Sequence, residues 1–250
     1  MISSLITAAK NLRFALASSL LVKTQLWDGL PYTVPRRIGR LVKLWRSLPG
    51  LREELDTAWN AYQGGDVIDV GSYHGIYAIV LSAKAKKKAR FVMLEPDPVA
   101  RAELYSNIGA LSALFPGIEY HVLPWPASDL SYATGLQTEI TNKHLKYQSA
   151  TVGANNTVRA VTLDELVKWL QIEPDLIKID VEGAEAQVLR GGKQSLMLFR
   201  PSLAIEIHPK WLSGNDDEAW ISSYLVSIGL ERTALVDGSP SRREMWRRKG

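Results

Sequence analysis

The chain has 250 residues, 46% hydrophobic and 22% charged, which suits one globular α/β domain with an appendage and leaves too little for two full domains. It contains no cysteine, so a disulfide framework, thiolate metal ligands and a cysteine nucleophile are all excluded. The histidines show no His-x-x-x-His spacing, which argues against a structural zinc site; they are His74, His121, His144 and His208. We therefore predict no required metal, and the composition leaves open only an ion held by carboxylates.

Charge is distributed unevenly along the chain, whose net charge is +4. Residues 1–60 contain nine Lys/Arg and four Asp/Glu, and residues 240–250 contain five Lys/Arg and one Glu. The part between them therefore carries a net negative charge, and basic ends flank a mildly acidic centre.

Residues 1–62 are predicted to form a basic helical extension ahead of the main domain, residues 63–250. Apolar residues recur at near-helical spacing over 5–22, but the uncharged stretch 14–22 is too short to span a bilayer, and a signal peptide is poorly matched. Residues 35–48 predict an amphipathic helix, with an apolar face opposite Arg36, Arg40 and Lys43. We expect this face to pack on the core of a cytoplasmic protein; the alternative is peripheral binding to an anionic membrane or another polyanion. The apolar face comprises Ile38, Leu41, Val42, Trp45 and Leu48.

From residue 66 onward, predicted strands and helices alternate along the chain. Short apolar runs predict strands at 66–70, 91–95, 119–123, 176–180 and 203–207, and helical patterns near 77–85, 99–111, 162–170 and 184–190 separate them. This alternation predicts an α/β fold with a mostly parallel sheet and helices on both of its faces. The basic tail 242–249 is expected to form the last strand.

Two glycines follow the first of these strands, where the chain turns into a helix. Gly71 and Gly75 allow positive φ and close approach of a ligand, and the helix beyond them offers free backbone N–H groups. Glycine at such a turn is equally explained by steric need alone. Glu95 supplies the second signal, because an acidic residue that ends the second strand of a doubly wound sheet accepts hydrogen bonds from the ribose of an adenosine cofactor.

The spacing of the glycines limits which cofactor fits. A dinucleotide site has the pattern Gly-x-Gly-x-x-Gly, whose second glycine makes room for the pyrophosphate, and here Tyr73 stands in that position. The pattern therefore argues against a nicotinamide-dependent oxidoreductase and favours an adenosine cofactor without phosphate, such as S-adenosylmethionine.

A series of motifs in order resembles the FkbM family of methyltransferases. They are Val67-Ile68-Asp69-Val70-Gly71-x-x-x-Gly75, Glu95-Pro96, Thr162-Leu163-Asp164 and, most specific, Asp175-Leu176-Ile177-Lys178-Ile179-Asp180-Val181-Glu182-Gly183-Ala184-Glu185. The resemblance covers about residues 66–208, although Ser72-Tyr73-His74 replaces the small or amide residues expected in the first motif. It implies a Rossmann-like class I methyltransferase with a seven-stranded sheet and bound S-adenosylmethionine.

The resemblance also implies how the cofactor is held. Asp69 and the turn to Gly75 would lie near the methionine tail, Glu95 would bind the ribose, and Asp129 would contact the adenine; a turn or cap role for Asp129 is the alternative. The full set of expected cofactor residues is Asp69, Gly71, Ser72, Tyr73, His74, Gly75, Glu95, Pro96, Ser128, Asp129 and Asp180.

Acidic residues gather where the methyl acceptor would bind. Lys178, Asp180 and Glu182 are expected to share one face of a strand, and these charges need partners or a ligand. The functional interpretation puts Asp180 and Glu182 at the acceptor, with Glu185 supporting the helix; the alternative is a salt bridge to Lys178 that only shapes the loop. Candidates for removing the acceptor's proton include a histidine, whose imidazole titrates near neutral pH. The expected catalytic residues are Asp180, Glu182, Glu206 and His208.

The resemblance implies O-methylation of a hydroxyl group on a sugar, a glycan or a natural product. The alternative is a non-catalytic module that binds RNA or an anionic membrane through the basic ends. Since no ordered aromatic platform for stacked bases is present, no specific nucleic-acid partner is predicted.

Overall fold

The computed structural model describes residues 20–130, 132–134, 136–141, 144–149, 157–212, 218–237 and 241–249, without side-chain detail over 131–158 and at 237. The helical pattern expected at residues 5–22 therefore lies almost entirely outside the described residues. None of the helices in the described ranges has the length and apolar character that crossing a membrane requires.

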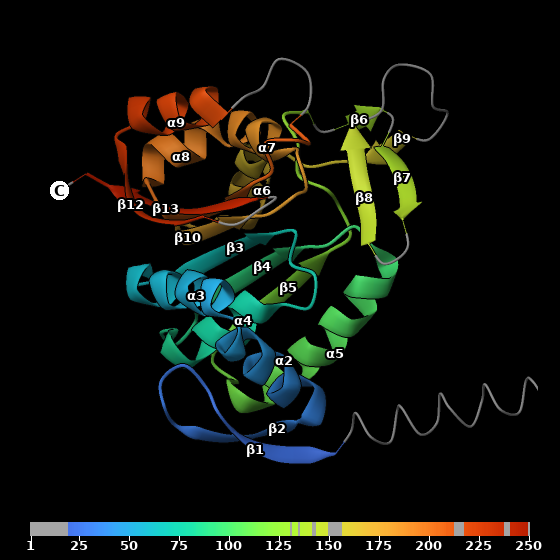
Figure 1. The fold of residues 1–250 in the computed structure, drawn as a ribbon, viewed down its shortest axis with the longest axis vertical. Coiled ribbons are helices and arrows are strands. Elements are labelled where there is room, and N and C mark those ends of the chain that lie inside the picture. The colour runs from blue at the N-terminus through green and yellow to red at the C-terminus, as the bar shows by residue number, and fades with distance from the viewer. Residues whose placement is uncertain are drawn as a thin grey trace, which may run out of the picture.

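A seven-stranded sheet forms the centre of the molecule, as predicted (Figure 1). Its order is β12-β13-β11-β10-β3-β4-β5; the five strands from β11 to β5 are parallel, and β13 runs antiparallel to both of its neighbours. The strands are β3 (Asp66–Val70), β4 (Arg90–Leu94), β5 (Glu119–Leu123), β10 (Pro174–Ile179), β11 (Ser202–Ile207), β12 (Leu230–Asp237) and β13 (Arg242–Arg248). Because the chain reverses its strand order between β3 and β10, the carboxyl ends of these two strands border the crevice where doubly wound folds bind ligands.

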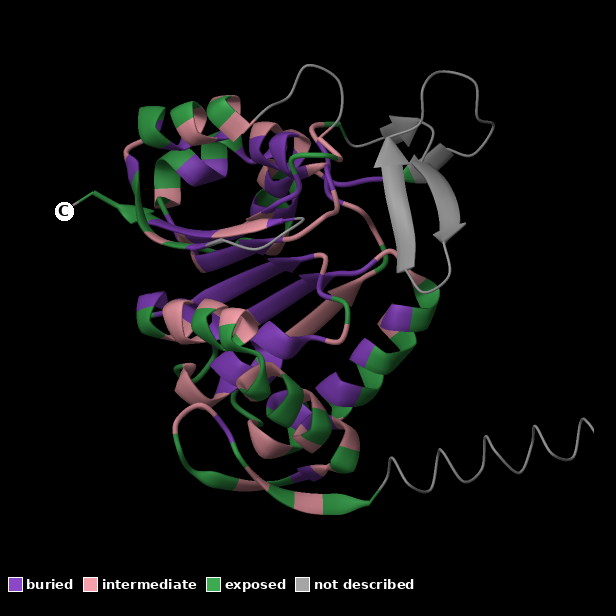
Figure 2. Ribbon diagram, in the orientation of Figure 1, coloured by how far each residue is buried: buried purple, intermediate pink, exposed green. Residues whose placement is uncertain are grey.

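Helices cover both faces of this sheet, and the predicted alternation of strands and helices is confirmed. Alternate strand residues enter two separate hydrophobic clusters, so that Val67 faces one layer and Ile68 faces the other. The first layer contains α4 (Ile76–Leu81), the short helix η1 (Ser82–Lys84) and α5 (Pro98–Leu114). The second contains α6 (Leu163–Leu170), α7 (Glu185–Gly191), α8 (Lys193–Phe199) and α9 (Glu218–Ser227). The central strands β3, β4 and β10 are almost wholly buried between the layers (Figure 2).

The N-terminal part contains a β-hairpin as well as helices. Its elements are β1 (Leu21–Gln25), β2 (Pro31–Pro35), α2 (Arg36–Ser47) and α3 (Pro49–Ala61). The sequence predicted only helices here; the strands are five residues long with alternating exposure in β1, too weak a pattern to identify against a helix. The predicted amphipathic helix is present as α2, and Ile38 and Val42 are buried in the core that also includes α4. Leu41 and Trp45 also pack against this core, so four of the five residues of the predicted apolar face lie on the domain, as expected, whereas Leu48 follows the helix and is exposed.

Two further strand pairs lie between β5 and α6 and were not predicted. Strand β6 (Tyr132–Thr134) pairs with β9 (Thr157–Arg159), and β7 (Leu136–Thr141) pairs with β8 (His144–Ser149). Both pairs are antiparallel and separate from the seven-stranded sheet. They form an insertion in the otherwise regular alternation of strands and helices.

Candidate active site

The turn after β3 takes a conformation that glycine makes accessible. Gly71 and Gly75 have φ of 77° and 75°, and the N–H groups of Gly71 and Ser72 donate to the carbonyl of Leu94 at the end of β4 (3.0 and 3.1 Å). A Cβ atom on Gly71 would overlap the carbonyl oxygen of Asp180. The first glycine is therefore required sterically, because the chain leaving β10 packs directly against this turn.

Glu95 lies beside the same turn, as the sequence predicted. The carboxylate is 5% exposed; its Oε2 accepts a hydrogen bond from the Tyr73 N–H (2.7 Å) and its Oε1 accepts one from the Asp97 N–H (2.9 Å). Burial raises the pKa of Glu95, while these two backbone donors act in the opposite direction. Pro96 follows, and Arg101 holds the carbonyls of Glu95 and Pro96 (both 2.8 Å). Two amides thus fix the orientation of the carboxylate at the edge of the sheet.

The two bulky residues of the turn, Tyr73 and His74, contact each other and the helix α5. The His74 Nδ1 lies 2.9 Å from Glu103 Oε2 on α5. Tyr73 is 46% exposed, and the centroids of its ring and of the His74 imidazole are 3.7 Å apart. Tyr73 itself has φ of 46°, a left-handed conformation that is uncommon for a side chain of this size. The turn therefore presents its backbone to Glu95, and the expected cofactor contacts of both side chains remain predictions.

Lys178 joins the ends of β3 and β10. Its Nζ lies 3.4 Å from Asp69 Oδ1 and 3.5 Å from Asp180 Oδ2, and donates to the Gly71 carbonyl (2.5 Å). Burial disfavours the charged ammonium, but Asp69 and Asp180 raise the pKa of Lys178. Burial also raises the pKa of Asp69, against the effect of Lys178. The salt bridge considered as an alternative for this region is thus present, and it connects a predicted cofactor residue with a predicted acceptor residue.

Ser128 and Asp129 belong to a different contact group. The Ser128 hydroxyl donates to Asp129 Oδ1 (3.2 Å), and Arg190 of α7 lies 3.4 Å from Asp129 Oδ2. The carbonyl of Ser128 packs so closely on Gly191 that a Cβ there would overlap it. No hydrogen bond or ion pair among the described residues joins this pair to Glu95 or Gly71. Their adenine contact stays a prediction, in competition with the Arg190 ion pair.

Three of the four predicted catalytic residues converge on the imidazole of the fourth, His208, which directly follows β11. Its Nε2 lies 3.7 Å from Glu206 Oε1, 3.7 Å from Glu182 Oε2 and 4.0 Å from Asp180 Oδ1. Strand β10 ends at Ile179, so Asp180 and Glu182 lie in a turn, contrary to the prediction that they share a strand face with Lys178. The turn is tight: Glu182 has φ of 54°.

Glu185 orients this histidine, a role that the sequence did not reveal. Its completely buried Oε1 lies 2.9 Å from His208 Nδ1 and also accepts from the Gly183 N–H (3.0 Å). The ring of Trp211 stacks on the imidazole ring, with centroids 5.1 Å apart and an interplanar angle of 12°. Burial lowers the pKa of His208, but the Glu185 hydrogen bond and the charges of Glu185, Asp180 and Glu182 raise it overall. With Nδ1 engaged, Nε2 is the nitrogen that faces the carboxylates.

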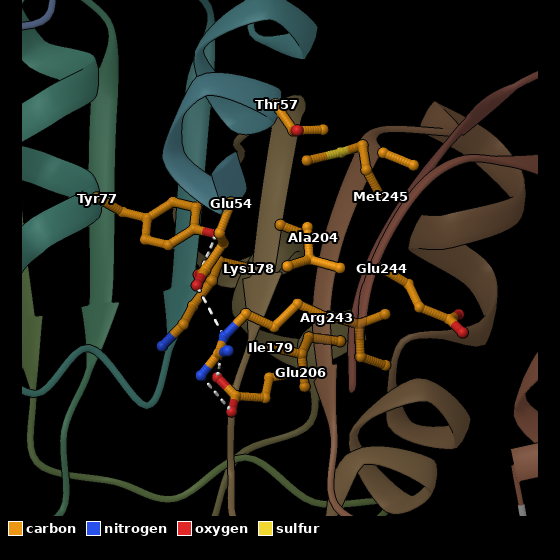
Figure 3. A pocket seen from close by; sticks show the side chains of 13 residues that line it. Glu54, Thr57, Tyr77, Lys178, Ile179, Ala204, Glu206, Arg243, Glu244 and Met245 are labelled. Atoms are coloured by element: carbon orange, nitrogen blue, oxygen red, sulfur yellow. Dashed lines mark hydrogen bonds and ion pairs between the residues drawn. The ribbon is translucent and has the colours of Figure 1, made fainter. Parts of the chain in front are cut away.

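A second network reaches Glu206 from the other side. Arg243 of β13 donates to both oxygens of Glu206 (3.1 and 2.8 Å) and lies 2.9 Å from Glu54 Oε2 of α3. The Tyr77 hydroxyl donates to the other oxygen of this carboxylate, Glu54 Oε1 (2.8 Å). Burial raises the pKa of Glu54 to about 7, although Arg243 and Tyr77 oppose this. Figure 3 shows Arg243 between the two carboxylates, in a cavity that is also lined by Lys178. Sequence reasoning missed Glu54, Tyr77 and Arg243 because they come from elements far apart in the chain.

The Methyltransferase FkbM domain matches residues 69–228, which includes the turn, Glu95 and the His208 cluster. This chain belongs to the FkbM methyltransferase family. The predicted α/β fold and the predicted family are both confirmed, and the family assignment implies S-adenosylmethionine as the methyl donor.

Relatives of this FkbM-family chain include the hexuronic acid methyltransferase AglP of Haloferax volcanii, 25% identical over 203 residues, which cover 78% of the chain and 80% of AglP. The AMB antimetabolite synthetase AmbE of Pseudomonas aeruginosa is 23% identical over 215 residues, 69% of the chain but 10% of AmbE. Among solved structures, the methyltransferase FkbM of Methylobacillus flagellatus KT has a TM-score of 0.51 and 19% identity. That similarity covers 73% of the chain and 44% of the solved one, and it supports the fold.

Proposed function

We propose that this FkbM-family protein transfers the methyl group of S-adenosylmethionine to a hydroxyl group of a sugar, a glycan or a sugar-containing natural product. The hydrogen bond between Glu95 and the Tyr73 N–H is the main support, because it joins the carboxylate expected at the ribose to the turn expected at the methionine tail. A tight turn and a buried carboxylate at adjoining strand ends suit a phosphate-free adenosyl cofactor.

The proposed cofactor site extends from this turn along the edge of the sheet. Asp69 is tied to Lys178, and Asp180 follows β10 against Gly71, so these residues would border the sulfonium end of the cofactor. Buried negative charge at this point would stabilise the positive sulfonium. The adenine would extend in the direction of Ser128 and Asp129, where the Asp129 carboxylate is shared with Arg190.

The acceptor is proposed to bind at Asp180, Glu182, Glu206 and His208. The three carboxylates lie within 4.0 Å of the His208 Nε2. Lys178 connects them to the cofactor side, because it pairs with both Asp180 and Asp69. Carboxylates and an imidazole can bind the several hydroxyl groups of a sugar by hydrogen bonds. A sugar acceptor is also supported by the relative AglP, which is named for action on a hexuronic acid.

Methyl transfer in this site would be an in-line displacement. The hydroxyl oxygen attacks the methyl carbon, the carbon–sulfur bond breaks with its electron pair remaining on sulfur, and the hydroxyl proton is lost. The protein then has to align donor and acceptor, exclude water and assist removal of the proton. Glu95 and His208 are buried and held in fixed orientations by hydrogen bonds, which supports the alignment of donor and acceptor and, at His208, the removal of the proton.

Isothermal titration with S-adenosylmethionine and with S-adenosylhomocysteine tests the cofactor assignment. Transfer of radiolabelled methyl from S-adenosylmethionine to hexuronic acids and neutral sugars tests the acceptor class. We expect saturable binding and transfer to a sugar hydroxyl. Absence of binding by both forms of the cofactor, together with salt-sensitive binding of RNA or anionic vesicles, would instead support the non-catalytic alternative.

A further inference from the structure

The imidazole of His208 is arranged in the way that metal-binding histidines are. Its side chain is 5% exposed, and Nδ1 is held by the completely buried carboxylate of Glu185 at 2.9 Å. In protein metal sites the ligating histidine commonly makes this hydrogen bond with its other nitrogen, which fixes the tautomer and the ring orientation. The opposite nitrogen, Nε2, makes no hydrogen bond to a described residue and is directed at carboxylates.

The surrounding oxygen atoms have the spacing of a coordination shell. One ligand atom each from Asp180, Glu182 and His208 can be chosen so that all three lie within 4.8 Å of one another. Ligands about 2.1–2.3 Å from one ion are separated by about 3–4.6 Å, so modest side-chain movement would bring these three atoms onto a common centre. The nitrogen stands 3.7–4.0 Å from the carboxylates, too far for hydrogen bonds.

We propose that Asp180, Glu182 and His208 bind one divalent cation, and that Glu185 acts as a positioning residue that orients the imidazole ligand. Two carboxylates and one imidazole form a mixed oxygen and nitrogen set, which suits Mn²⁺. The role of the cation rests on the proposed function: at the acceptor side it would coordinate a sugar hydroxyl and stabilise its deprotonated form, with the proton released to water.

The proposed ligand set leaves out Glu206 and Glu185; Asp180 pairs with Lys178 through Oδ2, and its Oδ1 is the oxygen near His208 Nε2. Glu206 forms a two-pronged ion pair with Arg243, and Glu185 holds the imidazole and the Gly183 amide. Glu182 has a side chain that is 40% exposed, so an ion could enter from its side. Water and the acceptor's oxygen atoms would complete the coordination shell.

Mn²⁺ binding to the full chain tests this proposal without requiring turnover. After dialysis against EDTA, MnCl₂ is titrated and free Mn²⁺ is followed by electron paramagnetic resonance; we expect one saturable equivalent per chain and a higher melting temperature with Mn²⁺. Titration with S-adenosylhomocysteine in the same EDTA-treated sample tests the proposed function separately. Cofactor binding without saturable Mn²⁺ binding would overturn the metal site alone, whereas Mn²⁺ binding without cofactor binding would uphold it and count against the proposed methyl transfer.

Substitutions locate the site. His208→Gln and Glu182→Gln should each weaken Mn²⁺ binding at least about tenfold, and Glu185→Gln about 10–100-fold through loss of the oriented imidazole. Glu231→Gln, at an exposed position of β12, is the matched control and should bind as the wild type does. Melting curves in EDTA check that each variant is folded, and the partly exposed Glu182 provides a ligand variant whose fold is least at risk. Equal Mn²⁺ affinity in the wild type, His208→Gln and Glu182→Gln would refute the site.

Discussion

The Glu95 Oε2 accepts a hydrogen bond from the Tyr73 N–H at 2.7 Å, which connects the end of β4 to the turn after β3. Its second oxygen accepts from the Asp97 N–H, so both oxygens of this carboxylate are oriented by backbone donors. Each oxygen still has a free lone pair, which leaves the carboxylate able to accept ribose hydroxyls. The position expected to bind the sugar of the cofactor is therefore fixed in advance of binding.

Substituting Glu95→Ala should weaken S-adenosylhomocysteine binding by about 10–100-fold, because hydrogen bonds to a charged acceptor contribute about 1.5–3 kcal/mol. Isothermal titration measures the change. Glu119→Gln, exposed at the start of β5, removes a carboxylate away from the site and should leave the dissociation constant as it is. Equal affinities of Glu95→Ala and the wild type would contradict the ribose assignment.

Substituting Gly71→Ala should lower the free energy of unfolding by about 2–4 kcal/mol, since the added methyl group overlaps the Asp180 carbonyl and the site has φ of 77°. Gly109→Ala is the matched control: this glycine lies within α5 and a Cβ there meets nothing within 4 Å. It should raise stability by about 0.5–1 kcal/mol, as alanine does in helices. Urea unfolding of both variants provides the comparison, and a Gly71→Ala protein as stable as the control would show that the turn can relax.

The sequence predicts those site residues that lie close, along the chain, to the ends of predicted strands. Glu95 and the Gly71 turn could be placed together, because each directly follows an apolar run and parallel strands bring their carboxyl ends to one edge. The cluster of Asp180, Glu182 and His208 could be predicted for the same reason. Residues that adjoin strand ends in the sequence also adjoin them in the fold.

The contacts that the sequence did not predict depend on pairings between distant elements. Arg243 meets Glu206 because β13 runs antiparallel to β11, with these two residues in register. Glu54 comes from α3, and its position depends on how that helix packs on the sheet. Likewise, β10 ends at Ile179 and Glu182 takes a left-handed conformation in the turn that follows, which residue alternation alone could not show.

Substituting Lys178→Met should lower the free energy of unfolding by about 3–5 kcal/mol, because it leaves Asp69 and Asp180 buried or half-buried without their shared cation. Adding Asp69→Asn to this variant should recover part of the loss, since the neutral amide no longer needs a counter-charge. A double-mutant cycle by urea unfolding measures the coupling between the two side chains. Strictly additive losses would show that the buried ion pair contributes nothing of its own.

Glu54 should make the stability of the protein decrease as pH rises toward neutral. Its pKa is about 7 in the folded protein, raised mainly by burial, against 4.5 for the ordinary group; the charged groups that face it are Arg243, Glu206 and Asp180, and Tyr77 donates to it. The folded state therefore binds a proton more tightly than the unfolded state between these two values. The stabilisation is complete below pH 4.5 and is lost as pH rises through 7, by about 3 kcal/mol in total.

Glu54→Gln isolates this contribution, because glutamine retains an acceptor for the Tyr77 hydroxyl but cannot titrate. Other groups titrate in both proteins and cancel in the comparison. Urea unfolding at intervals from pH 4.5 to 8 should show that the wild type loses more stability with rising pH than the variant does. If the two profiles ran parallel, Glu54 would have to be ionised throughout this range and its charge fully balanced by Arg243.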